Sequence, residues 1–162
     1  MGQVYGKRSE DGWVKVFRHH VNGGYFSSAN DWAEAKNVNP TNPDADKYSQ
    51  LYKLSDTWKI GNEFILKMVM DSYTNIWAQT QNPLLDAPAA ATVPGYRAIS
   101  VQTAANSWGG LSRADGSSSF LDANPANTNW YYPIASAGVW NGGMPQYDST
   151  GHPFVELWVK IR

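Results

Sequence analysis

The chain contains no cysteine. This absence excludes a disulfide framework, thiol catalysis and any zinc site with cysteine ligands. Charged residues are also few, since 13 Lys and Arg against 14 Asp and Glu give a formal net charge of −1. No basic stripe runs along the sequence, and binding to a nucleic-acid backbone needs several clustered cations. We therefore expect no nucleic-acid partner.

Long apolar runs are missing as well. No stretch approaches the roughly 18 to 20 apolar residues that span a bilayer, so we expect no membrane insertion. Residues 1–8 contain no apolar segment of the kind found in signal peptides. We expect that the chain either belongs to a longer protein or reaches its site of action without the secretory route.

Aromatic residues, in contrast, are abundant, with eight Trp, nine Tyr and five Phe. A chain of 162 residues can bury a real core and suits one domain, so we predict a single ligand-binding domain over residues 1–162. Trp and Tyr combine an apolar body with a polar tip and are common at binding surfaces. Eight Trp exceed what one such core needs, which indicates that some of them serve a surface.

Two segments at opposite ends of the chain have the alternating pattern of half-buried strands. Residues 154–162 place Val155, Leu157 and Val159 on one face, and the polar face carries Glu156, Trp158 and Lys160. Residues 13–19 form a similar mixed run. The ends of a domain often lie close together, so we predict that these two strands pair.

Three more strands are predicted over residues 63–70, 74–80 and 96–102, the first of them apolar on both faces and therefore buried on both. A short helix is predicted over residues 31–36. A second helix is predicted over residues 46–58, because apolar and aromatic residues recur there at helical spacing. The members of that stripe are Tyr48, Leu51, Leu54 and Trp58.

The third quarter of the chain is dense in turn residues, including Gly109, Gly110 and the pair Asn124-Pro125. Irregular backbone leaves polar groups unpaired when it is buried, so we predict that these loops lie at the surface. Short strands joined by long polar loops are typical of a mainly β fold. We expect a β-sandwich or jelly-roll-like domain with one or two short helices.

The strongest functional pattern is the interleaving of aromatic, amide and glycine residues in the loop-rich part. A sugar offers an apolar C–H face and a rim of hydroxyls, which suit a flat ring and side chains that both donate and accept hydrogen bonds. The predicted ligand-binding residues are Trp108, Asn129, Trp130, Tyr131, Trp140 and Asn141. The alternative is that these Trp residues fill the core beneath the loops.

Metal binding has only weak candidates, and we expect no cofactor. Asp44, Asp46 and Asp115 are the best oxygen ligands for calcium, although helix capping explains Asp44 and Asp46 equally well, and the EF-hand pattern does not fit. His19 and His20 end a predicted strand that leads into a hairpin, and adjacent strand residues point to opposite faces. The two rings are therefore not expected to share a metal.

Catalytic motifs are missing. The sequence has no Gly-x-Ser-x-Gly elbow and no glycine-rich nucleotide-binding loop. Glycoside hydrolysis needs two carboxylates that face each other across the bond, whereas Glu34, Glu63 and Glu156 are expected to face solvent. We expect no catalytic residues and no enzyme activity.

One series of motifs extends over nearly the whole chain. It runs through Val16-Phe-Arg, Tyr25-Phe-Ser-Ser, residues 35–43, Tyr48-Ser-Gln-Leu, residues 77–83, Trp108-Gly-Gly-Leu, Asn129-Trp-Tyr, residues 140–145 and Val155-Glu-Leu-Trp. As a set, the series resembles a Trp-rich domain found at the ends of phage tail-fibre-type proteins and in secreted invertebrate proteins with lectin-like domains. The resemblance implies an extracellular or virion-surface receptor-binding module. It also implies a homotrimer, because phage fibres are commonly trimeric.

Three functions are compatible with these features. The favoured one is a carbohydrate-binding, lectin-like attachment domain that recognises a cell-surface glycan or polysaccharide. A structural or protein-binding module that trimerises within a fibre is the alternative. A polysaccharide hydrolase would require a facing pair of carboxylates, which the sequence does not identify.

Overall fold

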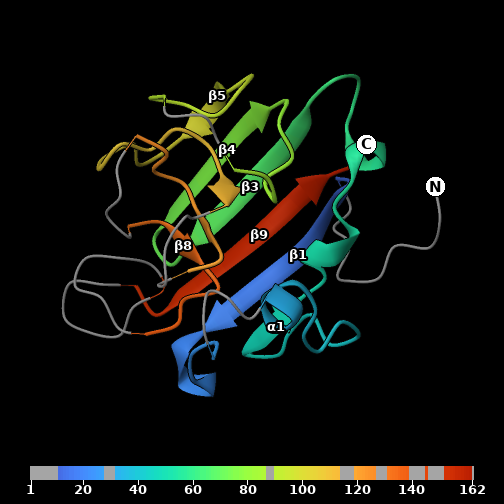
Figure 1. Ribbon diagram of the computed structural model, residues 1–162, viewed down its shortest axis with the longest axis vertical. Helices are drawn as coiled ribbons and strands as arrows, with labels where there is room; N and C mark the ends of the chain where they lie inside the picture. The colour runs from blue at the N-terminus through green and yellow to red at the C-terminus, as the bar shows by residue number, and fades with distance from the viewer. Residues whose placement is uncertain are drawn as a thin grey trace.

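The computed structural model describes residues 11–27, 32–86, 90–113, 119–126, 131–138, 145 and 152–161. These residues form a mainly β structure with two sheets (Figure 1). In chain order the elements are β1 (Trp13–His20), the 3₁₀ turn η1 (Val21–Gly23), α1 (Trp32–Lys36), β2 (Lys47–Ser49), the 3₁₀ turns η2 (Leu51–Lys53) and η3 (Asp56–Trp58), β3 (Phe64–Met70), β4 (Tyr73–Gln79), β5 (Arg97–Val101), β6 (Ser112–Arg113), β7 (Leu121–Asp122), β8 (Pro133–Ile134) and β9 (Phe154–Lys160).

The larger sheet has six strands in the order β2-β1-β9-β3-β4-β5. The first and last strands, β1 and β9, are antiparallel neighbours, with register partners from Trp13 and Lys160 at one end to His20 and Phe154 at the other. This confirms the predicted pairing of the two terminal segments. Strands β3, β4 and β5 also lie where the sequence predicts strands over residues 63–70, 74–80 and 96–102.

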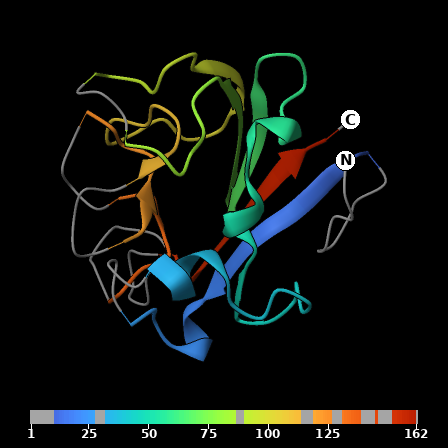
Figure 2. The same cartoon turned by 45° about the vertical axis from the view of Figure 1, so that its right-hand side comes forward.

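One face of the larger sheet forms the core. Leu66, Met68 and Leu157 are fully buried on this face, together with the alternate residues of the same strands. The smaller sheet, in the order β6-β7-β8, lies over this face as a second layer (Figure 2). Two antiparallel layers with little helix confirm the predicted mainly β, sandwich-type fold.

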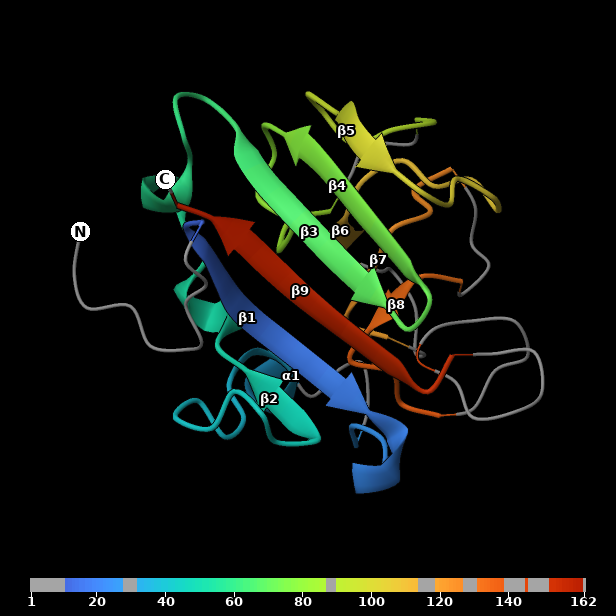
Figure 3. The same ribbon diagram turned by 180° about the vertical axis from the view of Figure 1, so that it is seen from behind.

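The opposite face of the larger sheet differs from the prediction for β3. This strand was expected to be buried on both faces, but only Phe64, Leu66, Met68 and Met70 are buried, whereas Ile65, Lys67 and Val69 are partly exposed. Figure 3 shows that none of the described segments crosses this face. We call it the open face of the larger sheet.

The second predicted helix, over residues 46–58, is wrong. This segment forms β2 and the two turns η2 and η3 instead. Tyr48, Leu51, Leu54 and Trp58 are all buried, so the apolar stripe correctly indicates burial but not helix. The backbone of β2 pairs with β1, and the Tyr48 hydroxyl donates to the Lys15 carbonyl at 3.1 Å, so sheet hydrogen bonds replace the helical ones. The short helix α1 is confirmed.

The chain after β1 also departs from the predicted hairpin. It turns through η1, where the His20 ring accepts from the Asn22 backbone N–H, and β1 pairs with β2 and β9 rather than with the next segment.

No described helix is long and apolar enough to cross a membrane.

The prediction that the loop-rich third quarter lies at the surface is wrong for much of that segment. Residues 108–112, 119–124 and 132–136 are buried and build the second layer. Their backbone groups find partners: Gly109 N–H donates to the Ala123 carbonyl and Phe120 N–H to the Ile134 carbonyl, both at 3.0 Å. Burial of irregular backbone is tolerated here because its donors and acceptors are paired.

The buried side chain of Gln79 joins the two layers. Its Oε1 accepts from Trp77 Nε1 at 2.8 Å and from the Leu111 backbone N–H at 2.9 Å. Its Nε2 donates to the carbonyls of Gln81 at 2.7 Å and Leu111 at 2.8 Å. The amide thus pairs with both backbone groups of Leu111, as a strand would.

We expect the Gln79→Leu substitution to lower the free energy of unfolding by about 3 kcal/mol, because several buried donors and acceptors lose their partner. Urea unfolding followed by circular dichroism measures this change. The matched control is Gln102→Leu, which removes an exposed bond from Thr74 N–H at 2.7 Å. Its expected cost is below about 1 kcal/mol. Equal losses in the two variants would contradict the role of Gln79.

His19 is a buried base at the end of β1. Its Nε2 donates to the Gly24 carbonyl at 2.8 Å, and its ring packs edge-on against Phe26 with centroids 5.0 Å apart. Burial lowers the pKa of His19 to about 4, and the positive charges of Lys47 and His20 add to this effect. The folded protein therefore holds the neutral ring at a pH where the unfolded chain takes up a proton.

Because the folded pKa lies below the unfolded value, we expect stability to fall as the pH drops from about 6.5 to about 4. The His19 contribution to this loss is about 3 kcal/mol. His19→Gln, whose amide also donates to Gly24, provides the matched control. The difference in unfolding free energy between the two proteins across this range isolates His19, and a constant difference would contradict the assignment.

Candidate functional site

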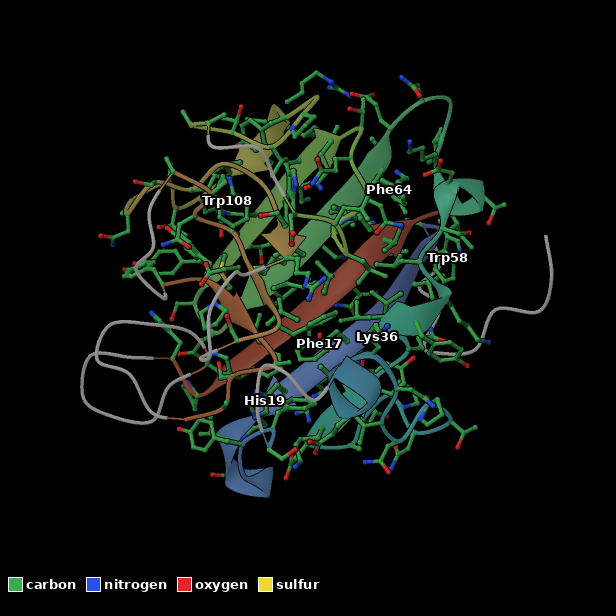
Figure 4. All side chains as sticks on the ribbon, viewed as in Figure 1. Phe17, His19, Lys36, Trp58, Phe64 and Trp108 are labelled. Carbon is green, nitrogen blue, oxygen red and sulfur yellow. The ribbon has the colours of Figure 1, made fainter. Side chains whose placement is uncertain are left out.

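Trp108, the first of the sequence-predicted binding residues, lies in the core. Its ring is only 7% exposed and packs edge-on against Trp77 and Tyr132, with centroids 4.9 and 5.0 Å away. Its Nε1 donates to the Tyr96 hydroxyl at 2.9 Å. Figure 4 places it on the side of β4 that the second layer covers. This placement matches the alternative in which the ring fills the core, so Trp108 is not part of the candidate surface.

Tyr131 is partly exposed at the start of the segment that leads into β8. Its ring packs edge-on against Tyr132, with centroids 4.7 Å apart. Asn129, Trp130, Trp140 and Asn141 lie outside the described residues. Their positions relative to Tyr131 therefore lie outside what the structure describes.

A different group of aromatic residues lies on the open face of the larger sheet. Residues that are direct register partners point to the same face. Trp158 on β9 stands between Lys15 on β1 and Lys67 on β3. In the next row, Lys160 on β9 stands between Trp13 and Ile65. Two Trp and three Lys thus occupy adjacent rows on three neighbouring strands.

These side chains form an alternating ladder of cations and rings. Lys67 Nζ lies 4.6 Å from the centroid of Trp13 and 4.9 Å from that of Trp158. Lys160 Nζ lies 5.7 Å from the centroid of Trp13, and Lys15 Nζ lies 5.4 Å from that of Trp158. Distances below about 6 Å are those of cation–π contacts. We call Trp13, Trp158, Lys15, Lys67 and Lys160 the Trp–Lys ladder.

Glu156 neutralises one end of the ladder. Its carboxylate lies 3.0 Å from Lys15 Nζ and 3.4 Å from Arg18 Nε, and it accepts from Trp158 Nε1 at 3.0 Å. The hydrogen bond fixes the Trp158 indole on the open face. Toward the other end of the ladder, Lys67 and Lys160 form no ion pair with any described residue, although the charge of Asp11 acts on Lys67.

The cation at the centre of the ladder is partly desolvated. Burial lowers the pKa of Lys67, and the neighbouring charge of Lys160 lowers it further, whereas the charges of Asp11 and Glu156 raise it. The ring faces supply partial compensation through their quadrupoles. Burial and the surrounding charges therefore act on the Lys67 ammonium group in opposite directions.

The predicted calcium ligands Asp44 and Asp46 make contacts with cations. Asp44 lies 3.3 Å from Lys15 Nζ, and Asp46 lies 3.4 Å from Arg18 Nη1. Neither caps a helix, because β2 follows them. In the part of the chain that the structure describes, no three His, Asp or Glu residues gather in a way that could hold a metal. Asp115 lies outside the described residues.

Asp122 is a buried carboxyl on β7. Burial raises its pKa to about 7, and hydrogen bonds from backbone N–H groups, including that of Tyr132 at 3.2 Å, act in the opposite direction. The carboxyl thereby satisfies donors at the turn between β7 and β8. This contact explains its burial as part of the second layer.

The sequence contained one signal for the ladder. Residues 154–162 placed Trp158 and Lys160 on the polar face of an alternating strand, where a large ring is unusual. Trp13 and Lys67 carried no such signal, because their alignment with Trp158 depends on the order β1-β9-β3. Pairing of segments that are distant in the chain brings the ladder together.

Comparison with known proteins gives no relative of this chain. No protein-family model matches it, and no curated protein or solved structure is significantly similar to it.

We expect the Lys67→Ser substitution to increase acrylamide quenching of the Trp fluorescence, because its side chain lies over both ladder rings. The matched control is Lys53→Ser, which removes a lysine that lies over Tyr52, 5.8 Å from the ring centroid. Quenching constants measured by steady-state and lifetime fluorescence test this. Unchanged quenching in Lys67→Ser would show that the ladder is not formed in solution.

Proposed function

We propose that this domain binds carbohydrate and acts as an attachment module at a cell or virion surface. The open face of the larger sheet is the observation that carries this proposal. It presents the partly exposed ring of Trp158, held by its bond to Glu156, beside lysine side chains. A ring flanked by hydrogen-bond donors suits the apolar face and hydroxyl rim of a sugar.

Other groups on the same face support the same ligand. Register places Thr74 beside Val69 and Ser100 beside Ile76, so two hydroxyls accompany aliphatic side chains on β3 and β4. Hydroxyls both donate and accept hydrogen bonds, as sugar recognition requires. A regular sheet also holds its side chains in fixed positions, which reduces the entropy lost on binding.

The resemblance to Trp-rich domains of tail-fibre-type and secreted proteins agrees with an extracellular attachment role. The abundance of Asn, Trp and Gly in residues 106–110, 129–132 and 139–143 agrees with it as well. Under this proposal the ligand contacts the open face, and the loops remain a second candidate contact through Trp130 and Trp140.

We expect the Trp158→Ala substitution to weaken binding to a glycan found on an array by about tenfold, because the stacking ring is lost. Titration calorimetry with that glycan measures the change. Trp108→Phe is the matched control, because Trp108 is a core residue, and its affinity should equal that of the unmodified protein.

The Trp130→Ala and Trp140→Ala variants distinguish binding at the loops from binding on the open face. If these variants lose binding while Trp158→Ala retains it, carbohydrate binding stands and its placement on the open face is wrong. Failure to bind any neutral or acidic glycan would overturn the proposed function.

A further inference from the structure

The Trp–Lys ladder carries an unbalanced pair of cations. Lys67 and Lys160 both lie over Trp13, at 4.6 and 5.7 Å from its centroid, and neither forms an ion pair with a described residue. Every other cation of the open face has a carboxylate partner among the described residues: Lys15 and Arg18 pair with Glu156, and Arg97 pairs with Glu63 at 2.9 Å. Two positive charges therefore remain available on one stretch of the face.

The two ammonium groups lie over the same ring, where the charges of Asp11 and Glu156 also act on Lys67. Two ammonium groups that share one ring repel each other, and burial of Lys67 weakens the hydration that would screen them. Ring faces attract the cations but cannot neutralise them. An anionic group placed between or beside the two ammonium groups removes the repulsion and forms charge-assisted hydrogen bonds.

The surroundings limit what kind of anion fits. Glu156, Asp44 and Asp46 border the same face and would repel a dense polyanion. A nucleic-acid duplex carries one charge per about 1.7 Å of its axis and needs many phosphate contacts. Two cations beside a Trp ring instead suit a ligand polymer whose charges are isolated and separated by apolar faces.

Building on the proposed function, we propose that the ligand is an acidic polysaccharide, whose carboxylate or sulfate groups bind Lys67 and Lys160 while a sugar ring contacts the partly exposed Trp158. The aliphatic stems of the two lysines and the Trp158 ring supply the apolar contacts. The ammonium groups supply the selectivity for charge, because a neutral sugar leaves them unpaired.

The first experiment changes the ligand and leaves the protein intact. Polygalacturonate, its fully methyl-esterified form and a carrageenan that carries a single sulfate per disaccharide are titrated into the unmodified protein in a calorimeter. We expect the free acid to bind at least about tenfold more tightly than the ester, since each charge-assisted hydrogen bond contributes about 1.5 to 3 kcal/mol. The tighter binder of polygalacturonate and the carrageenan identifies the preferred anionic group. Affinity should fall as salt rises.

The second experiment changes the protein. Lys67→Gln and Lys160→Gln keep most of the side-chain stem and remove the charge, and each should weaken binding to the acidic polymer by about tenfold. Binding to the methyl ester should change little. Lys53→Gln removes the same charge away from the open face and is the matched control. Melting temperatures confirm that each variant is folded.

The outcomes separate this inference from the proposed function. If the ester binds as tightly as the acid, or if Lys53→Gln weakens binding as much as Lys67→Gln, the acidic specificity is wrong and carbohydrate binding stands. If single-stranded DNA or phosphatidylserine vesicles bind as tightly as the acidic polymers, recognition depends on charge alone and the inference is overturned. If no polysaccharide binds, both fail.

Discussion

The side-chain amide of Gln79 is the connection on which the two-layered arrangement depends. It lies at the end of β4 and pairs with both backbone groups of Leu111, just before β6 begins. Gly110 allows the close approach, since it has a φ of +90° and an added Cβ would lie 2.5 Å from Val93 Cγ2. With Leu111 held there, Trp108 can pack beside Trp77 and the short strands can cover the core. The second layer contributes few strand residues, and side-chain hydrogen bonds from Gln79 and Asp122 supplement its backbone pairing.

Among the described residues, the second layer covers only one face of the larger sheet, so the two faces have different roles. The covered face is apolar and packs against the second layer, whereas the open face collects the Trp–Lys ladder and its neighbouring acids. Sheets of this kind normally present a polar face to water. Here Trp13 and Trp158 lie on that face with lysine side chains over them, so Trp13 is buried and Trp158 is only partly exposed. Stability and the proposed recognition therefore depend on opposite faces of the same strands.

Sequence patterns predicted the features that depend on local alternation. The strands at both ends, their pairing and the mainly β class follow from residues such as Val155, Leu157 and Val159, because period two is visible in one short segment. The prediction of a helix over residues 46–58 was wrong because an apolar stripe indicates burial and not backbone conformation. The sheet partner of this segment is β1, which the segment's own sequence does not reveal. The buried second layer was missed because its backbone partners, such as Gln79 for Leu111, lie about thirty residues away. The ladder needed the strand order as well, which no local pattern contains.

The pairing of β1 with β9 also determines how the domain would bear a mechanical load. Trp13, the first residue of β1, and Lys160, the last residue of β9, are register partners, so both strands leave the sheet at the same end. Tension applied between those two points would break the β1–β9 hydrogen bonds one after another, beginning with those nearest Trp13 and Lys160. Tension between one end and a ligand on the Trp–Lys ladder would instead act within the last rows of β1 and β9, because Trp13 and Lys160 belong to the ladder, and would leave the other β1–β9 hydrogen bonds unloaded. A domain anchored at a single end would thus resist pulling far better than one stretched between both.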